Sequence, residues 1–338
     1  MSDAAWLMFA AARAQGNGQL QAVTQDASPF VFFYDWNSGV PVKLSNPASL
    51  PAGACDGAAW GGDGNRYVIL GVTVTPFVKI YDWDSGSPVA LADPADLPAG
   101  VSAGCGASPD GRYLAVAHVG LPYVTVYDMD SGTPVKVADP AVALPGNATE
   151  VAWSADNAYI AITHVSGVTV YNWTAGVGFG TVVSLSANLG SNGQSVAFTS
   201  DNNYMACGST LTPFVHFYDI SSEPFTKLAN PAALPTAECR GVGWDSASQY
   251  AAFACLNSPF VFLYDITSGT PTKEADPSSL PPASQVAVGF RGAGTTILTC
   301  CGATTPFVNI YDYATIPMVK QANPASLPTA TCRDTAFD

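Results

Sequence analysis

The chain has 338 residues, a formal net charge of −14 at pH 7 and only 12 lysines and arginines. Charged residues make up 11% of it, well below the roughly 25% of an average globular protein. Nucleic acid is bound by basic surfaces, so this composition excludes nucleic acid as a partner. Membrane insertion is also excluded, because no run approaches the roughly 18 apolar residues of a membrane span.

Residues 1–18 are predicted to form an N-terminal arm, either a short helix capped by Ser2 or Asp3 or an extra strand. The apolar stretch at 4–12 lacks the preceding basic residues of a secretion signal, so we predict no signal peptide. Two roles remain open for the arm. It docks a partner through Trp6, or it packs on the rim of the folded domain.

One phrase, an apolar run that ends in Tyr-Asp or Tyr-Asn, returns seven times along the chain. It is usually preceded by Thr-Pro-Phe or Ser-Pro-Phe, and successive tyrosines are 47, 46, 44, 47, 46 and 47 residues apart. A fixed period of this length is typical of a β-propeller. The tyrosines are Tyr34, Tyr81, Tyr127, Tyr171, Tyr218, Tyr264 and Tyr311.

The third repeat shows four strands. Ser-Pro-Asp-Gly at 108–111 predicts a turn, with strands at 113–118, 123–127 and from 134 to 137. A fourth strand precedes the turn, and a Pro-rich connection leads to the next repeat. The lysine that recurs in the 134–137 phase predicts a solvent-facing outer edge strand. In most copies the fourth strand carries an aromatic residue, namely Trp60, Trp153, Phe198, Trp244, Phe290 or Phe337.

The C-terminal segment 331–338 matches the strand around Trp244, yet the chain ends just after it. It is therefore predicted to complete the first blade, so that the two ends of the propeller share one sheet and no edge stays open. The expected fold is all-β. Residues 19–338 form a single seven-bladed propeller of four-stranded blades.

Groups able to do chemistry are scarce. The three histidines lie in or at the ends of strands, where surface polarity is the simplest interpretation, and the eight cysteines are predicted to be buried free thiols. Glu150 and the three other glutamates share no phase of the repeat. The Asp-x-Asp-Ser-Gly loops are turns on one acidic face. We therefore predict no catalytic residue, no metal and no cofactor.

The fourth repeat departs from the others. Between His164 and Gly193 it lacks the Pro-Phe phrase and both proline signals of the connection. Drift explains such a copy, and so does a partner that replaces lost contacts. On the second interpretation the partner-binding residues are Tyr171, Asn172, Trp173 and Phe179, together with Trp6.

The SPDGRYLAVA segment and the Tyr-Asp phrase resemble WD-repeat and YVTN-type propellers over essentially the whole chain. The repeated sequence is also similar to that of propeller proteins of bacteriophage virions. That resemblance implies a non-enzymatic structural propeller that contacts other proteins in a larger assembly, located in the virion or otherwise soluble.

Two alternatives remain. A host-surface glycan binder would stack sugars on Trp36, Trp83 and Trp173, although packing explains these tryptophans more simply. A lactonase-like small-molecule enzyme would need a cluster of unlike polar residues in the central channel. A channel lined by small repeated residues would exclude the enzyme.

Overall fold

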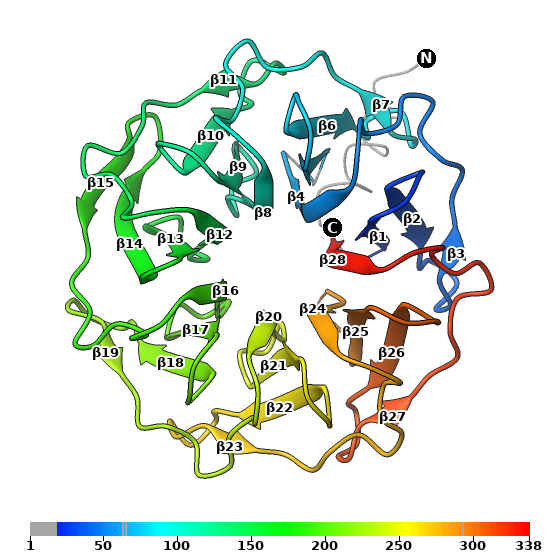
Figure 1. The fold of residues 1–338 in the computed structure, drawn as a ribbon, viewed down its shortest axis with the longest axis vertical. Coiled ribbons are helices and arrows are strands. Elements are labelled where there is room, and N and C mark those ends of the chain that lie inside the picture. Colours follow the sequence, from blue (N-terminus) through cyan, green and yellow to red (C-terminus); the bar gives the residue numbers. More distant parts are fainter. Residues whose placement is uncertain (1–18, 63, 65, 293) are drawn as a thin grey trace, which may run out of the picture.

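The computed structural model describes residues 19–338 except 63, 65 and 293, so the predicted arm and Trp6 lie outside the described residues. Seven four-stranded antiparallel sheets form a ring around a central channel (Figure 1). This confirms the seven-bladed all-β propeller. Within the described residues, no helix is long and apolar enough to cross a membrane.

Each blade runs outward from the channel. The innermost strands are β28 (Cys332–Phe337), β4 (Cys55–Gly61), β8 (Ser102–Ala107), β12 (Ala148–Trp153), β16 (Gly193–Phe198), β20 (Cys239–Trp244) and β24 (Gln285–Phe290). The second strands are β1 (Leu20–Gln25), β5 (Tyr67–Val72), β9 (Tyr113–His118), β13 (Tyr159–His164), β17 (Tyr204–Ser209), β21 (Tyr250–Cys255) and β25 (Ile297–Gly302).

The third strands end in the repeated phrase. They are β2 (Val31–Asp35), β6 (Val78–Asp82), β10 (Val124–Asp128), β14 (Gly167–Thr174), β18 (Val215–Asp219), β22 (Val261–Asp265) and β26 (Val308–Asp312). The outer strands are β3 (Val42–Lys43), β7 (Val89–Ala90), β11 (Val135–Lys136), β15 (Gly178–Val182), β19 (Thr226–Lys227), β23 (Thr272–Lys273) and β27 (Val319–Lys320). The recurring lysines thus lie on outer edge strands, as predicted.

The ring closes as predicted, because the C-terminal strand β28 pairs with β1 in the order β28-β1-β2-β3. Leu20 donates its backbone N–H to the Asp338 carboxylate at 2.9 Å, and Arg333 binds Asp26 through two hydrogen bonds of 2.6 and 3.0 Å. The first and last residues of the described chain therefore hold each other in one blade (Figure 1).

The repeated tyrosine joins neighbouring blades. Tyr81 is fully buried, and its hydroxyl donates a hydrogen bond of 2.7 Å to the carbonyl oxygen of Ser49, in the Pro-rich connection that leaves the preceding blade. The other five bonds of this kind run from Tyr34 to Ser326, Tyr127 to Asp96, Tyr171 to Val142, Tyr264 to Ala233 and Tyr311 to Ser279.

Tyr218 breaks this series. It is fully buried like the others, but its hydroxyl has no hydrogen-bond partner. The connection before it, after β15, is the one without prolines, and it forms a short parallel bridge between Leu185 and Phe225 instead. The irregular fourth repeat thus removes the acceptor for the tyrosine of the fifth blade.

The cysteine prediction needs one correction. Cys239 and Cys255 form a disulfide between β20 and β21, at positions that face each other across one blade. Two residues so paired are neighbours, unlike equivalent positions in different blades. The other six cysteines are buried free thiols, as predicted.

Candidate functional site

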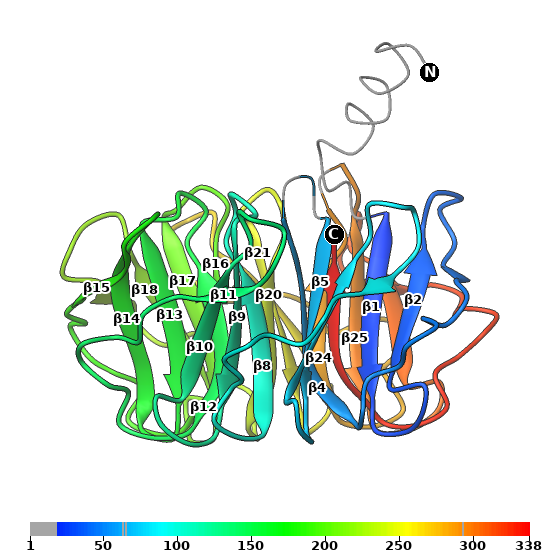
Figure 2. The same cartoon turned by 90° about the horizontal axis from the view of Figure 1, so that it is seen from above.

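A cavity of about 320 Å³ opens in the central channel, lined by the first residues of the innermost strands. These strands start at the end of the ring opposite the C-terminus (Figure 2). Near its start each innermost strand contains a β-bulge against the second strand of its blade. Bulges re-aim side chains, and here they set the side chains that face the channel.

The second residue of the innermost strands differs from blade to blade. Going around the ring from β4, this position holds Asp56, Ala103, Thr149, Gln194, Arg240, Val286 and Arg333. Acidic, basic, amide, hydroxyl and apolar groups thus meet at one level of a repeating fold. The channel is therefore lined by unlike residues and not by small repeated ones.

Glu150 is the third residue of β12, where five of the other innermost strands have Gly, Ala or Ser. Its carboxylate packs over Gly104, whose position would place a Cβ only 2.6 Å from Glu150 Oε1. Burial and the negative charge of Asp334 hold the pKa of Glu150 well above its usual range, against one hydrogen bond from the Val151 N–H.

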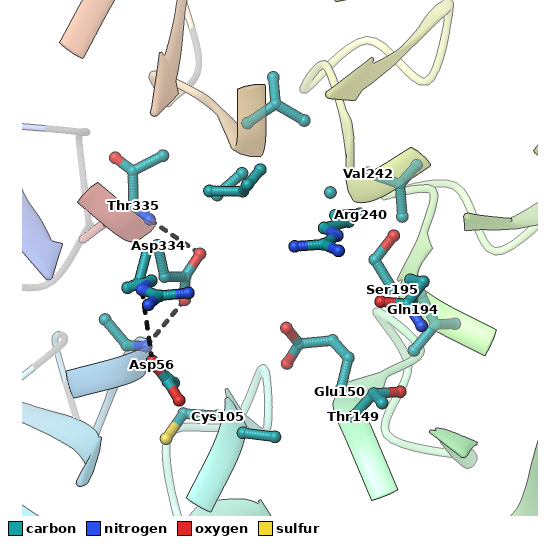
Figure 3. A pocket seen from close by; sticks show the side chains of 18 of the residues that line it. Asp56, Cys105, Thr149, Glu150, Gln194, Ser195, Arg240, Val242, Asp334 and Thr335 are labelled. Carbon is teal, nitrogen blue, oxygen red and sulfur yellow. Dashed lines mark hydrogen bonds and ion pairs between the residues drawn. The ribbon is translucent and has the colours of Figure 1, made fainter. Parts of the chain in front are cut away.

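Asp334 is the other exception, at the third residue of β28. It accepts hydrogen bonds of 2.8 Å from its neighbour Thr335 N–H and from Ala58 N–H on β4 of the adjacent blade. Burial raises the pKa of Asp334 to about 6, although these two donors favour the ionised form. Asp334 and Glu150 face each other across the cavity (Figure 3).

Arg333 and Asp56 form the rim beside Asp334. The Arg333 guanidinium lies 3.8 Å from Asp56 while it binds Asp26. Burial raises the pKa of Asp56, and the charge of Arg333 acts against this increase. Because Arg333 is shared by two carboxylates, its charge is largely balanced within the rim.

Arg240 projects into the cavity from the side opposite Asp334 (Figure 3). Its Nε donates a hydrogen bond of 2.7 Å to Glu238, the residue just before β20, and Cys239 between them is held by the disulfide. Next to it, Val242, Val286 and Val288 make one wall of the cavity apolar. The site therefore has a polar side with two carboxyl groups and an apolar side with an arginine.

Two carboxyl groups whose environments differ are suited to acid–base catalysis, since one can be ionised while the other holds its proton. Among residues 19–338, apart from the three gaps, no group of three or more His, Cys, Asp or Glu side chains is arranged to hold a metal ion. The chemistry available from these side chains is proton transfer next to a guanidinium.

The residues predicted to bind a partner lie in and around the fourth blade. Tyr171 and Trp173 are buried, and the Trp173 ring packs against Tyr113, Trp153 and Phe179 with centroids 5.0 to 5.5 Å apart. Asn172 donates a hydrogen bond to Thr181. The aromatic side chains therefore pack within the sheet, the Asn172 bond lies at the surface, and a role of these residues in partner binding stays a prediction.

The structure corrects the interpretation of the three histidines and confirms the packing interpretation of three tryptophans. His118, His164 and His216 are buried and hydrogen-bonded to hydroxyl groups at 2.9 to 3.0 Å, so they are interior residues and not the surface residues we expected. Trp36, Trp83 and Trp173 are at most 4% exposed, which confirms packing and leaves no face on which a sugar could stack.

The acidic loops lie at the opposite end of the ring from the site. A second cavity of about 320 Å³ lies there, lined by the loop after Asp128, the turn around Gly111 and the segment at Arg66 and Tyr67 of the preceding blade. Its two arginines are paired in place, Arg66 with Asp82 and Arg112 with Asp128. At this end the arginines and aspartates pair with each other, in agreement with the interpretation of these loops as turns.

Sequence reasoning missed the channel residues Glu150, Asp334, Asp56 and Arg240. The prediction rested on groups that recur at a fixed position of the repeat, whereas the site is built from residues that break the repeat. The signal was available, since aligned innermost strands show Glu150 and Asp334 where other copies have small residues. In a symmetric array, a site for an asymmetric ligand must depart from the symmetry.

No protein-family model matches the chain, and no curated protein matches it in sequence. Among solved structures it is similar to a putative 6-phosphogluconolactonase from Bacteroides fragilis, with a TM-score of 0.74 and 13% identity over 94% of this chain and 97% of that one. A second protein of that name from Bacteroides uniformis gives a TM-score of 0.73 and 12% identity, over 94% and 99% of the two chains.

A WD-like neighbour is the β-propeller domain of Cps50 (Swd1) from Myceliophteria thermophila, with a TM-score of 0.61 and 12% identity over 88% and 95% of the chains. At such identities the likeness establishes the seven-bladed propeller fold and its WD-like relatives. The expectation of a bacteriophage virion component is wrong, because none of these neighbours is a bacteriophage protein and two are named as putative 6-phosphogluconolactonases.

Proposed function

We propose that this chain is a lactonase-like hydrolase that opens a small hydroxylated lactone in its central channel. The observation that carries the proposal is the pair Glu150 and Asp334, two carboxyl groups with raised pKa values that face each other beside Arg240. The names of the two lactonase neighbours support the same class of reaction.

In this mechanism Asp334, ionised above its pKa of about 6, accepts a proton from a water molecule, and the water oxygen forms a bond with the lactone carbonyl carbon. Arg240 stabilises the negative charge that develops on the carbonyl oxygen. When the ring C–O bond breaks, protonated Glu150 donates its proton to the leaving oxygen. Proton transfer from Asp334 to Glu150 through water then restores the site, and the product is the hydroxy acid.

The geometry supports these roles. The two backbone N–H donors hold the Asp334 carboxylate in one orientation at the wall of the cavity. Glu150 has a single backbone donor, and its burial together with the negative charge of Asp334 favours its protonated form. The cavity, with a volume of about 320 Å³, is large enough to hold a ligand the size of a monosaccharide.

The test is hydrolysis of gluconolactone and of 6-phosphogluconolactone, measured by proton release and corrected for the spontaneous reaction. We expect kcat/KM to rise with pH through about 6, and D334N, E150Q and R240Q each to lower it by about 10² to 10⁴-fold. The matched control is D130N, an exposed carboxylate at the opposite end of the ring. No hydrolysis above background for either lactone, or equal losses in D130N and D334N, would refute the proposal.

A further inference from the structure

The outer edge of the propeller is uniform except at the fourth blade. Six of the seven outer strands are two residues long, whereas β15 extends over five residues, and Gly180, Thr181 and Val182 are exposed. No strand of the described chain pairs with its outer side, because the sheet order is β12-β13-β14-β15. An edge of this length presents unpaired backbone N–H and C=O groups to solvent.

The same blade has lost the features that protect the other edges. Each short outer strand follows a proline by one or two residues and is followed by a second proline, whereas the sequence has no proline between Pro145 and Pro213. Five of the six short strands end in lysine. The pairing of Tyr127 with Lys136 on β11 corresponds to the pairing of Tyr171 with Val182 on β15, so Val182 replaces the lysine. Proline and lysine are the residues that block edge-to-edge pairing.

Charge singles out this blade as well. The chain has a net charge of −14, yet residues 157–200 contain no Asp, Glu, Lys or Arg. Two copies of a strongly acidic protein repel each other over most of their surfaces. At the rim of the fourth blade this repulsion is weakest, and Val177 and Val182 add apolar surface, being 73% and 41% exposed.

From these observations we infer that β15 is a self-association edge, on which β15 of a second copy of this chain pairs antiparallel about a two-fold axis. Two four-stranded blades would then form one continuous eight-stranded sheet, with the same strand contributed by both subunits. A partner of opposite charge is disfavoured, since this rim carries no charge for it to match. The contact leaves the channel open, because β15 is the strand of its blade farthest from the axis (Figure 1).

The test is the mass of the full chain in solution, measured by light scattering after gel filtration at 1 to 100 µM. We expect the wild type to approach the mass of a dimer at 100 µM and V182K to stay a monomer, because V182K restores the lysine of the repeat, a residue that blocks edge-to-edge pairing. The matched control, V135K, adds a lysine on the exposed outer strand β11 and should remain a dimer.

Hydrogen exchange gives a second readout that does not depend on a variant. Backbone amides of residues 178–182 should exchange several-fold more slowly at 100 µM than at 1 µM, whereas those of β11 should not change. A monomeric wild type at 100 µM, or a dimer that V182K leaves intact, would overturn the inference. The hydrolysis assay tests a different part of the molecule, so V182K should keep the wild-type kcat/KM per subunit if the proposed function holds.

Discussion

Tyr81 donates a hydrogen bond of 2.7 Å to the carbonyl oxygen of Ser49, and this bond links a blade to the connection that arrives from its predecessor. It explains why the phrase that defines the repeat ends in tyrosine. The ring of the side chain fills the space between sheets, and the hydroxyl satisfies a carbonyl of a Pro-rich segment that has few donors of its own.

The first prediction compares two tyrosines that differ only in this bond. Y81F should lower the free energy of unfolding by about 0.5 to 1.5 kcal/mol, because the partly buried hydrogen bond to the Ser49 carbonyl oxygen is lost. Y218F should be neutral or stabilising, since the Tyr218 hydroxyl is buried without a partner. Urea denaturation followed by tryptophan fluorescence measures both, and equal losses in the two variants would contradict the role assigned to the bond.

The sequence alone was sufficient to predict the fold, because every blade repeats the same pattern of strands and turns. The period of the tyrosines predicted the number of blades, and the match between 331–338 and the strand around Trp244 predicted closure by β28. The disulfide between Cys239 and Cys255 was missed, because cross-strand pairing within one blade depends on a register that the repeat period does not define.

The site was less accessible to this reasoning. Glu150 and Asp334 lie 184 residues apart in the sequence and belong to different blades. Only closure of the ring brings their carboxyl groups to one cavity. Their raised pKa values arise from burial between innermost strands, which no local pattern reveals. Conversely, Tyr171 and Trp173 attracted attention as members of an irregular repeat, although their own side chains are ordinary core residues.

The second prediction concerns the pH dependence of stability. The folded-state pKa of Glu150 is raised, so its contribution to stability is fully present below the pKa of the unfolded chain and is lost as the pH rises toward the folded-state value. E150Q keeps the acceptor for Val151 and cannot ionise. The stability of E150Q relative to wild type should therefore increase between pH 4.5 and 8, by at most about 1.4 kcal/mol per pH unit.

Urea midpoints of both proteins, measured across this range, give the difference directly. The buried histidines, with pKa values of about 4 for His164 and about 3 for His216, titrate in the same way in both proteins and cancel. A difference that stays constant over the whole pH range would show that the carboxyl group of Glu150 titrates normally.

The third prediction uses the close approach of two innermost strands. G104A would place a Cβ 2.6 Å from Glu150 Oε1 and equally near the Thr149 carbonyl oxygen, so the Glu150 side chain must move out of its position. We expect kcat/KM for lactone hydrolysis to fall at least tenfold, and the free energy of unfolding to fall as well, because the backbone at Thr149 must also shift. The control is G243A on β20, where a Cβ meets its nearest atom at 3.4 Å. If both variants retain full activity, the position of Glu150 is not critical.

The fourth prediction concerns the disulfide that holds the strand carrying Arg240. Cys239 and Cys255 close a loop of 16 residues, for which removal of the cross-link costs about 3 kcal/mol in the chain-entropy model. The double variant C239A/C255A should unfold at a lower urea concentration, and a reducing agent should shift the wild type in the same direction once the buried bond becomes accessible. The matched control is C55A, which removes a buried free thiol from the first position of another innermost strand.

Alkylation of the unreduced, denatured wild type should label six cysteines, and labelling of all eight would show that the bond is absent. Arg240 follows Cys239 directly, so loss of the disulfide should make the Arg240 guanidinium more mobile. The double variant should therefore also have a lower kcat/KM for lactone hydrolysis, whereas C55A should keep the wild-type value.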